Sequence, residues 1–420
     1  MGDLLRERIG TALPDWAISV LASLITITII LIAAILTMML MVWVERRVIA
    51  RVQDRIGPNR VGPQGILQSI ADGVKMFTKE DIIPQAADRW VHWLAPIVVL
   101  APVVLLFAVV PWGRGLVPTE FSGGALFVLA ISSISAIGLM MAGWASSNKF
   151  ALLGAMRAVA QLISYEIPGV LAMLSSVLVF GTMDLNKIAE AQAGLPIVGT
   201  TAGPDFGLGW LIFTPVGLVG FGIFFICTLA EGERTPFDIP EADSEIVAGH
   251  TTEYSGMKFA LFYIGQYILN FVLAMIVSLV FLGGWQGPGV AALAAAHQDI
   301  LAGVLSLLYL MLKAWLLFFV MVMLRGALPR LRVDQLMDFA WKFLLPLALV
   351  NLFSGALWVA LTQWPPDKGF AFTAGLSLLV RQLLAFVITA AINGSMFFWL
   401  IRVHAAADQE DSGESEAIPV

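Results

Sequence analysis

The hydrophobic residues of the chain are concentrated in long apolar segments that alternate with polar connections. Runs of roughly twenty apolar residues are long enough to cross a bilayer as helices. The pattern therefore predicts an all-α polytopic membrane protein with about nine transmembrane helices. They form one membrane domain, residues 16–401, with spans near 16–44, 91–110, 124–144, 158–180, 208–230, 258–282, 300–324, 343–362 and 374–401. Outside it lie an N-terminal segment, residues 1–15, and an acidic tail, residues 402–420, which we expect to be disordered.

The distribution of positive charge predicts the orientation of these spans. Most lysines and arginines fall in the connections after the first, third, fifth and seventh spans and after the ninth. Because cytoplasmic connections carry an excess of lysine and arginine, this side is expected to be cytoplasmic. The N-terminus then lies outside and the C-terminus in the cytoplasm. The two long loops, residues 45–90 and 231–257, are expected to share the cytoplasmic face.

The first of these loops contains a different hydrophobic pattern. From Gln64 to Glu80 apolar residues recur at helical spacing, with polar residues elsewhere around the helix. Such a helix is too polar to span, so we predict an amphipathic helix along the membrane surface. Two interpretations stay open, a simple anchor and a functional element. The preceding sequence RIGPNRVGPQG is rich in glycine and proline, which favours a non-helical segment able to shape a cavity wall.

Composition excludes several kinds of chemistry. The chain has one cysteine, so it can form neither an internal disulfide nor a cluster of thiolate ligands. Its four histidines fall in different segments without metal-binding spacing, and interfacial positions explain them better than ligation. It contains no phosphate-binding loop and no dinucleotide fingerprint. We therefore expect no cofactor or metal bound by this chain. We also expect no nucleic-acid partner, although the net charge, which comes largely from one loop and the tail, says little on this point.

Ionisable residues are nearly absent from the predicted spans, and the exceptions are candidates for function. Glu166 is the only carboxylate within them, and Pro168 loosens the helix beside it. A buried carboxylate must be protonated or paired, so a role in proton handling is the default hypothesis and a structural hydrogen bond is the alternative. Lys313 and Arg381 are the cations within spans. Each can pair inside the bundle or extend to an interface, and the sequence leaves both open.

The second long loop concentrates acidic residues between two apolar segments. Residues 231–254 contain seven carboxylates together with Arg234 and two prolines. Clustered carboxylates raise one another's pKa by repulsion and desolvation, whereas a nearby arginine lowers it. Such a group can change its proton occupancy when the local charge changes. The alternative is that these acids bind basic residues of partner proteins.

Three stretches resemble a known family. They are ERRVIARVQDRIGPNRVGPQGILQSIADGVKMFTKED (residues 45–81), RAVAQLISYEIP (157–168) and AEGERTPFDIPEADSEIVAGHTTEYSGMKFALF (230–262). They closely resemble, in the same order, the signature stretches of the family of H subunits of respiratory complex I, the proton-pumping NADH–quinone oxidoreductase. The resemblance covers about residues 43–401 and not the acidic tail. It implies a multi-pass subunit of a bacterial-type plasma membrane that joins the hydrophilic redox arm to the antiporter-like membrane arm.

The resemblance also implies roles for individual residues. The chain is expected to form the membrane part of the quinone chamber, lined by Arg46, Gln53, Arg55, Asp72, Lys75, Arg234 and Phe237. An acidic path to the proton-translocating half is expected to contain Glu166, Glu231, Asp238, Glu241, Asp243, Glu245 and Glu253. Quinone, either ubiquinone or menaquinone, is the implied substrate. FMN and iron–sulfur clusters are implied to lie in partner subunits, and small membrane subunits to adjoin the antiporter-like arm.

The chain departs from the family pattern at several positions relevant to the acidic path, one of which is Asp243, where the family often has glutamate. Gln266 stands where the family often has glutamate in the sixth span, and Glu233 stands at a commonly uncharged position. We interpret Glu233 as the first candidate for a bystander. Two other functions compete with this one. A stand-alone transporter would predict internal repeats, which are not visible, and a related subunit of a membrane-bound hydrogenase or another donor-dependent complex stays open.

Overall fold

The computed structural model describes residues 15–119, 121–194, 207–239, 246–363 and 377–415. The described residues contain no strand, and the prediction of an all-α polytopic membrane protein is confirmed. The helices are α2 (Asp15–Val52), α3 (Gln68–Thr78), α4 (Arg89–Leu106), α5 (Gly124–Ala145), α6 (Lys149–Phe180), α7 (Leu185–Ala191), α8 (Pro215–Glu231), α10 (Gly256–Phe281), α11 (Val290–Ala295), α12 (Asp299–Ala327), α13 (Val333–Asp338), α14 (Leu345–Thr362) and α15 (Leu378–Ser415). Short helical turns are η1 (Pro63–Gly65), η2 (Leu211–Phe213), η3 (Gly249–Thr251) and η4 (Phe339–Leu344).

Each predicted span corresponds to a helix, but one is shorter than expected. Within the described residues, 8 helices are long and apolar enough to cross a membrane, and α8 is a shorter apolar helix. It starts at Pro215 rather than near residue 208, because Thr214 caps it and accepts a hydrogen bond from the Gly217 N–H at 3.0 Å. Proline is favoured at the first helical position. The fifth predicted span is therefore shorter than the apolar run that predicted it.

Other helices are longer than the apolar runs that predicted them. Helix α2 continues to Val52, beyond the expected end near residue 44. Helix α6 begins at Lys149, where Asn148 accepts a hydrogen bond from the Phe150 N–H at 2.9 Å, rather than near residue 158. Helix α15 extends to Ser415, into the segment expected to be a disordered tail. In each case the helix includes polar residues that a hydrophobicity pattern assigns to loops.

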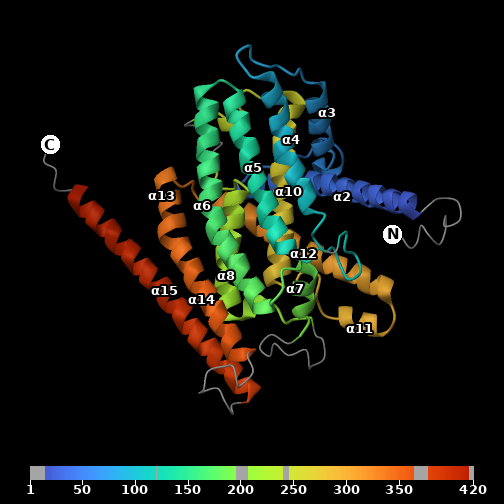
Figure 1. Ribbon diagram of the computed structural model, residues 1–420. Helices are drawn as coiled ribbons and strands as arrows, with labels where there is room; N and C mark the ends of the chain where they lie inside the picture. The colour runs from blue at the N-terminus through green and yellow to red at the C-terminus, as the bar shows by residue number, and fades with distance from the viewer. Residues whose placement is uncertain (1–14, 120, 195–206, 240–245, 364–376, 416–420) are drawn as a thin grey trace.

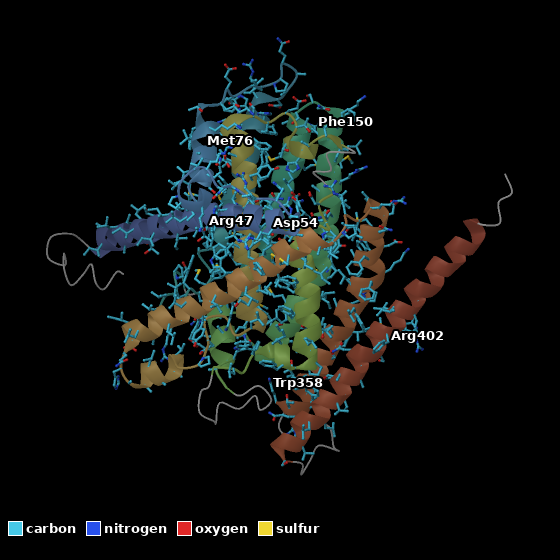
Figure 2. The ribbon with its side chains drawn as sticks, turned by 180° about the vertical axis from the view of Figure 1, so that it is seen from behind. Arg47, Asp54, Met76, Phe150, Trp358 and Arg402 are labelled. Carbon is cyan, nitrogen blue, oxygen red and sulfur yellow. The ribbon has the colours of Figure 1, made fainter. Side chains whose placement is uncertain are left out.

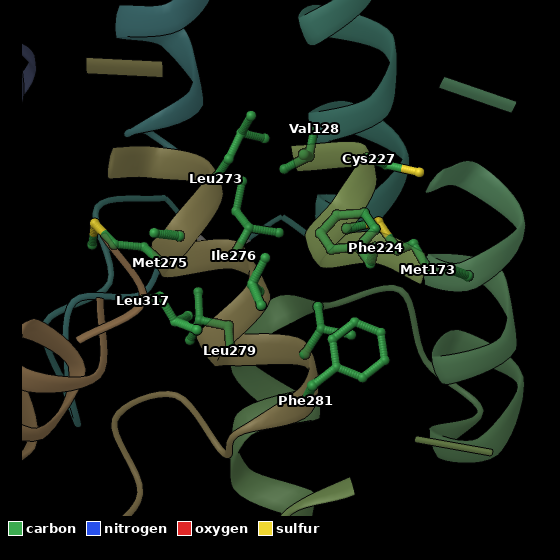
Figure 3. Packing of buried hydrophobic residues seen from close by; sticks show 14 of the residues in the cluster. Val128, Met173, Phe224, Cys227, Leu273, Met275, Ile276, Leu279, Phe281 and Leu317 are labelled. Atoms are coloured by element: carbon green, nitrogen blue, oxygen red, sulfur yellow. The ribbon is translucent and has the colours of Figure 1, made fainter. Parts of the chain in front are cut away.

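The helices form a bundle around α10. Helices α4, α5 and α6 pack in sequence, and α10 contacts α4, α8, α12 and α2. Helices α2 and α12 run across the bundle, whereas α15 lies on its outside next to α14 and diverges from it (Figure 1). In the most apolar 18-residue stretch of α10, 83% of the residues are buried, whereas in that of α2 only 11% are buried. The core lies where Leu273, Ile276 and Phe281 of α10 meet Phe224 of α8 (Figure 3). Helix α2 therefore presents most of its surface to the surroundings.

The two long loops, which were expected to share a face, contact each other. Helix α3 is held against α2 by the Ser69 hydroxyl, which donates to the Met39 carbonyl at 3.0 Å. Beyond α3, the Ile82 N–H donates to Ser255 Oγ at 2.9 Å, and Lys258 pairs with Asp81 at 2.8 Å. In Figure 2, Met76 of α3 and Phe150 of α6 lie at one end of the bundle, and Trp358 of α14 lies toward the other.

The predicted surface helix exists over a shorter range, residues 68–78. None of its residues is buried, and its apolar side chains face outward, with Phe77 72% exposed. An amphipathic helix with an uncovered apolar face suits a membrane surface, as predicted.

Candidate functional site

A buried ion cluster joins three distant parts of the chain. Arg234, in the loop after α8, donates from Nη1 to both carboxylate oxygens of Glu45 at 2.7 Å each. Arg325 of α12 donates to the same carboxylate. The Arg234 guanidinium lies over the aromatic ring of Tyr267, with its Cζ atom 4.4 Å from the ring centroid. Burial disfavours the charge of Arg234, but Glu45 and Tyr267 outweigh this and raise its pKa above the ordinary value.

A large cavity opens beside this cluster. Its volume is about 800 Å³, and it lies between the end of α2, the loop that follows and the end of α12. Glu45, Arg325 and Tyr267 form its polar wall, and Ile49 and Ile56 contribute apolar surface. Figure 2 labels Arg47 and Asp54 at this end of α2, partway along the bundle. The cavity therefore combines apolar walls with a few fixed polar groups, as ligand sites do.

The residues expected to line a quinone chamber divide into two groups. Arg46, Gln53 and Arg55 line the large cavity. Asp72 pairs with Arg46 at 2.5 Å. Partial burial raises the pKa of Asp72, but hydrogen bonds from Gln68 and Arg46 outweigh it and hold the pKa below its usual value.

The other four chamber candidates, Asp72 among them, do not line this cavity. Lys75 is exposed on α3. Arg234 lies behind the wall, bonded to Glu45. Phe237 is buried with its ring edge toward Tyr165, and the ring centroids are 5.2 Å apart.

A second, smaller cavity lies behind the cluster. Its volume is about 40 Å³, and its polar lining consists of Ser135, Glu231, Glu233, His250 and Gln266. Burial lowers the pKa of His250 to about 4, so this imidazole is neutral at neutral pH. Glu233 directly precedes Arg234 in the chain, and Gln266 directly precedes Tyr267. In each pair the first residue lines the small cavity and the second belongs to the ion cluster beside the large cavity.

Beside the small cavity, Glu231 at the end of α8 is followed by a second carboxylate, Glu166 of α6. Glu231 is hydrogen-bonded to Ser132 of α5 and lies close enough to Glu166 for their charges to interact. Glu166 accepts a hydrogen bond from Ser133, and it is half-buried rather than fully enclosed. Glu166 thus makes the hydrogen bond to a neighbouring helix that one alternative describes and also adjoins a second carboxylate, and its role in proton handling stays a prediction.

Of the other acidic-path candidates, Asp238 and Glu253 lie within the described residues, and each contacts another side chain. Asp238 pairs with Arg330 at 3.3 Å, but burial outweighs the arginines around it and raises its pKa. Glu253 accepts a hydrogen bond from Asn148 at 2.7 Å. Glu241, Asp243 and Glu245 lie outside the described residues.

The cations within spans bond to backbone carbonyls. Lys313 donates to the carbonyls of Leu282, Gly284 and Gln286 at 2.7–2.8 Å. Arg381 donates to the Leu361 carbonyl at 2.9 Å. Both side chains thus stay inside the bundle rather than extending to an interface. In the described part of the chain, no group of three or more histidine, cysteine, aspartate or glutamate residues could hold a metal ion.

Sequence reasoning missed Glu45, Tyr267 and Arg325. The hydrophobicity pattern assigns Glu45 to a loop because the apolar run ends at residue 44. Glu45 and Ile49 are separated by one helical turn, and both line the large cavity. Extending helical spacing across the polar end of α2 would have placed Glu45 on this face. No comparable signal identifies Arg325 or Tyr267.

Comparisons with known proteins agree along most of the chain. The NADH dehydrogenase family model matches residues 25–356. The H subunit of the NADH-quinone oxidoreductase of Dehalococcoides mccartyi strain CBDB1 is 43% identical over 346 residues, which cover 82% of this chain and 88% of the relative. The protein of the same name from strain ATCC BAA-2266 / KCTC 15142 / 195 is also 43% identical over 346 residues, with the same coverage.

Proposed function

Because this chain belongs to the NADH dehydrogenase family, we propose that it is the membrane subunit of a proton-pumping NADH–quinone oxidoreductase. In this role it forms the membrane part of the quinone chamber and an acidic path that couples quinone reduction to proton translocation. It carries no redox centre. Electrons come from NADH through FMN and iron–sulfur clusters in partner subunits, and quinone is the substrate.

The large cavity is the observation that carries this proposal. Its volume of about 800 Å³ falls in the range of small-molecule sites. Arg46, Gln53 and Arg55 supply hydrogen-bond donors at its wall, and Ile49 and Ile56 supply apolar surface for an isoprenoid tail. The chain provides the membrane-side passage, and partner subunits bind the quinone headgroup more deeply.

Coupling follows from the ion cluster between the two cavities. When a quinone is reduced, the two electrons that it accepts add negative charge next to Glu45, Arg234 and Arg325 until two protons neutralise it. In a site shielded from water, such a change alters the proton affinity of nearby carboxylates. Glu231 and Glu166 then pass the response toward the proton-translocating half. Asp238, Glu241, Asp243, Glu245 and Glu253 belong to the same path.

The partners and orientation of the chain are also part of the proposal. The loops at residues 45–90 and 231–257 face the cytoplasm of a bacterial-type plasma membrane, where they meet the quinone-site and terminal iron–sulfur subunits. Small membrane subunits adjoin the opposite flank. Purification in mild detergent tests this arrangement, because NADH-oxidising subunits must then co-purify with the chain.

Substitution of Glu231 tests the acidic path. Glu231→Gln in the assembled enzyme is expected to lower quinone reduction and coupled proton uptake by about tenfold or more, since an amide cannot carry a proton. NADH oxidation by the water-soluble acceptor ferricyanide stays unchanged and reports intact assembly. Glu190→Gln, an exposed carboxylate on α7, is the matched control. Full quinone reduction with full coupling in the Glu231 variant would contradict the path.

A further inference from the structure

The small cavity contains a carboxylate that the path described so far does not use. Helix α8 ends at Glu231, and the chain turns through Gly232 into Glu233, whose φ of 49° is left-handed. The turn brings both carboxylates, Glu231 and Glu233, to the same cavity. Glu233 is 8% exposed, so it is shielded from bulk solvent.

Gly232 fixes the position of this turn. A Cβ atom at residue 232 would lie 1.9 Å from Asn270 Oδ1, so only glycine allows so close an approach to α10. Asn270 in turn donates to the Gly232 carbonyl at 3.2 Å. The two carboxylates are therefore held at the cavity by a tight contact rather than by a loose loop.

Gln266 faces Glu233 across the cavity. Its amide nitrogen lies 3.4 Å from Glu233 Oε2 and 3.5 Å from the Gly232 carbonyl, to which it donates. An amide side chain can orient a carboxylate but cannot bind and release a proton itself. Between the Arg234–Tyr267 wall and Glu231, the described carboxylate that can do so is Glu233.

The cavity has the size and polarity to hold water. Its volume of about 40 Å³ exceeds the roughly 15 Å³ that one water molecule requires in the same measure. His250, which lines it, is 2% exposed, and its Nδ1 has no hydrogen-bond partner among the described residues. A buried polar atom of this kind requires a partner, and a cavity water supplies one.

We propose that Glu233 is a proton-carrying residue that links the ion cluster of the large cavity to Glu231 through water in the small cavity. This role rests on the proposed function of the acidic path. In the transfer, Glu233 releases its proton to a water molecule, and that water releases one of its own protons to the Glu231 carboxylate. Glu233 becomes ionised and Glu231 neutral, so the total charge is unchanged.

The primary test is Glu233→Gln in the assembled complex, studied in inverted membrane vesicles. The glutamine oxygen still accepts the hydrogen bond from Gln266, so a purely structural contact is preserved and only the titratable group is lost. Coupled quinone reduction is expected to fall by about tenfold or more. Ferricyanide reduction is unchanged, and Glu190→Gln matches the wild type in both assays.

Rescue by a displaced carboxylate separates a proton carrier from a structural residue. The double variant Glu233→Gln/Gln266→Glu returns a carboxylate to the same cavity from α10, so most of the lost activity is expected to return. If the single variant fails to assemble, the double variant decides: coupled turnover in the assembled enzyme supports the role, and its loss overturns it.

The outcome also distinguishes this role from the acidic path as a whole. Full coupling in Glu233→Gln together with loss in Glu231→Gln would remove Glu233 from the path and leave the path itself intact. Full coupling in both variants would overturn the path.

Discussion

Two consecutive residues of α2 form ion pairs in opposite environments. Glu45 is bonded to Arg234, and the side chains are 3% and 4% exposed. Its neighbour Arg46 is bonded to Asp72 of the surface helix, and these side chains are 47% and 33% exposed. The same helix thus holds one pair within the protein and one at the surface, each joining α2 to a different loop.

The two ion pairs have similar geometry, but they are expected to differ in their contribution to stability because one is buried and the other is exposed to solvent. Burying a charge is costly, and removing one partner leaves the other charge uncompensated, whereas a surface pair gains little because water screens it. We therefore infer that the Glu45 cluster sets the position of the acidic loop, while the Arg46–Asp72 pair adjusts the placement of α3.

Loss of Arg234 is expected to have the largest effect. Arg234→Met removes a buried partner of Glu45 and is expected to destabilise the protein by about 3–5 kcal/mol. Arg325 still pairs with Glu45 but is partly exposed, so it compensates incompletely. The loss is measured as a lower denaturation midpoint in detergent and as less of the chain assembled in the membrane.

The double variant Glu45→Gln/Arg234→Met is the control for this prediction. It removes the uncompensated charge, so it is expected to be more stable than Arg234→Met alone. If the single variant were as stable as the wild type, burial would not be the property that separates the two pairs.

The contrast between the two pairs also marks what the sequence could predict. Apolar runs located the long helices of the described residues, because burial in lipid requires them, and the two long loops contact each other. Helix ends were missed where polar residues continue the helix, as at Glu45 in α2 and Lys149 in α6. Propensity and hydrophobicity do not show that a distant arginine will compensate a buried glutamate.

The candidate site was predictable where a residue lies near its partners in sequence. Arg46, Gln53 and Arg55 fall within one stretch, and all three line the large cavity. Phe237 instead packs into the core beside Tyr165, and Arg325 reaches Glu45 from another helix. Such contacts depend on packing between helices, which one sequence does not specify. The charge pattern alone marks Glu233 as a bystander, whereas its place in the small cavity leads to the opposite proposal.

An intermediate effect is expected from His250, which is buried and has no charged partner among the described residues. Its folded pKa of about 4 lies below the ordinary value of 6.5, so between these values the unfolded chain binds a proton that the folded chain does not. Stability therefore falls as the pH decreases from 6.5 toward 4. This difference in pKa lowers the free energy of unfolding at about pH 5 by about 2 kcal/mol relative to neutral pH.

The variant His250→Phe isolates this contribution. Phenylalanine has a similar shape and does not titrate, so the variant is expected to lose less stability between neutral and acidic pH than the wild type. Denaturation midpoints of the two proteins across this pH range provide the measurement. Parallel curves for both would show that burial of His250 does not govern its protonation.

The smallest effect is expected at the surface pair. Asp72→Ala removes a partly exposed partner of Arg46 and is expected to cost less than about 1 kcal/mol, an amount that shrinks further as salt rises. Lys79→Ala, on the same surface segment and exposed, is the matched control for stability.

If α3 lines the quinone entrance, Asp72→Ala and Lys75→Ala also change the rate with long-tailed quinones more than with short-tailed ones, because the tail must pass the helix. Equal rates with both quinones in both variants would leave α3 as a membrane anchor, and a stability loss as large as that of Arg234→Met would refute the distinction between the buried and the exposed pair.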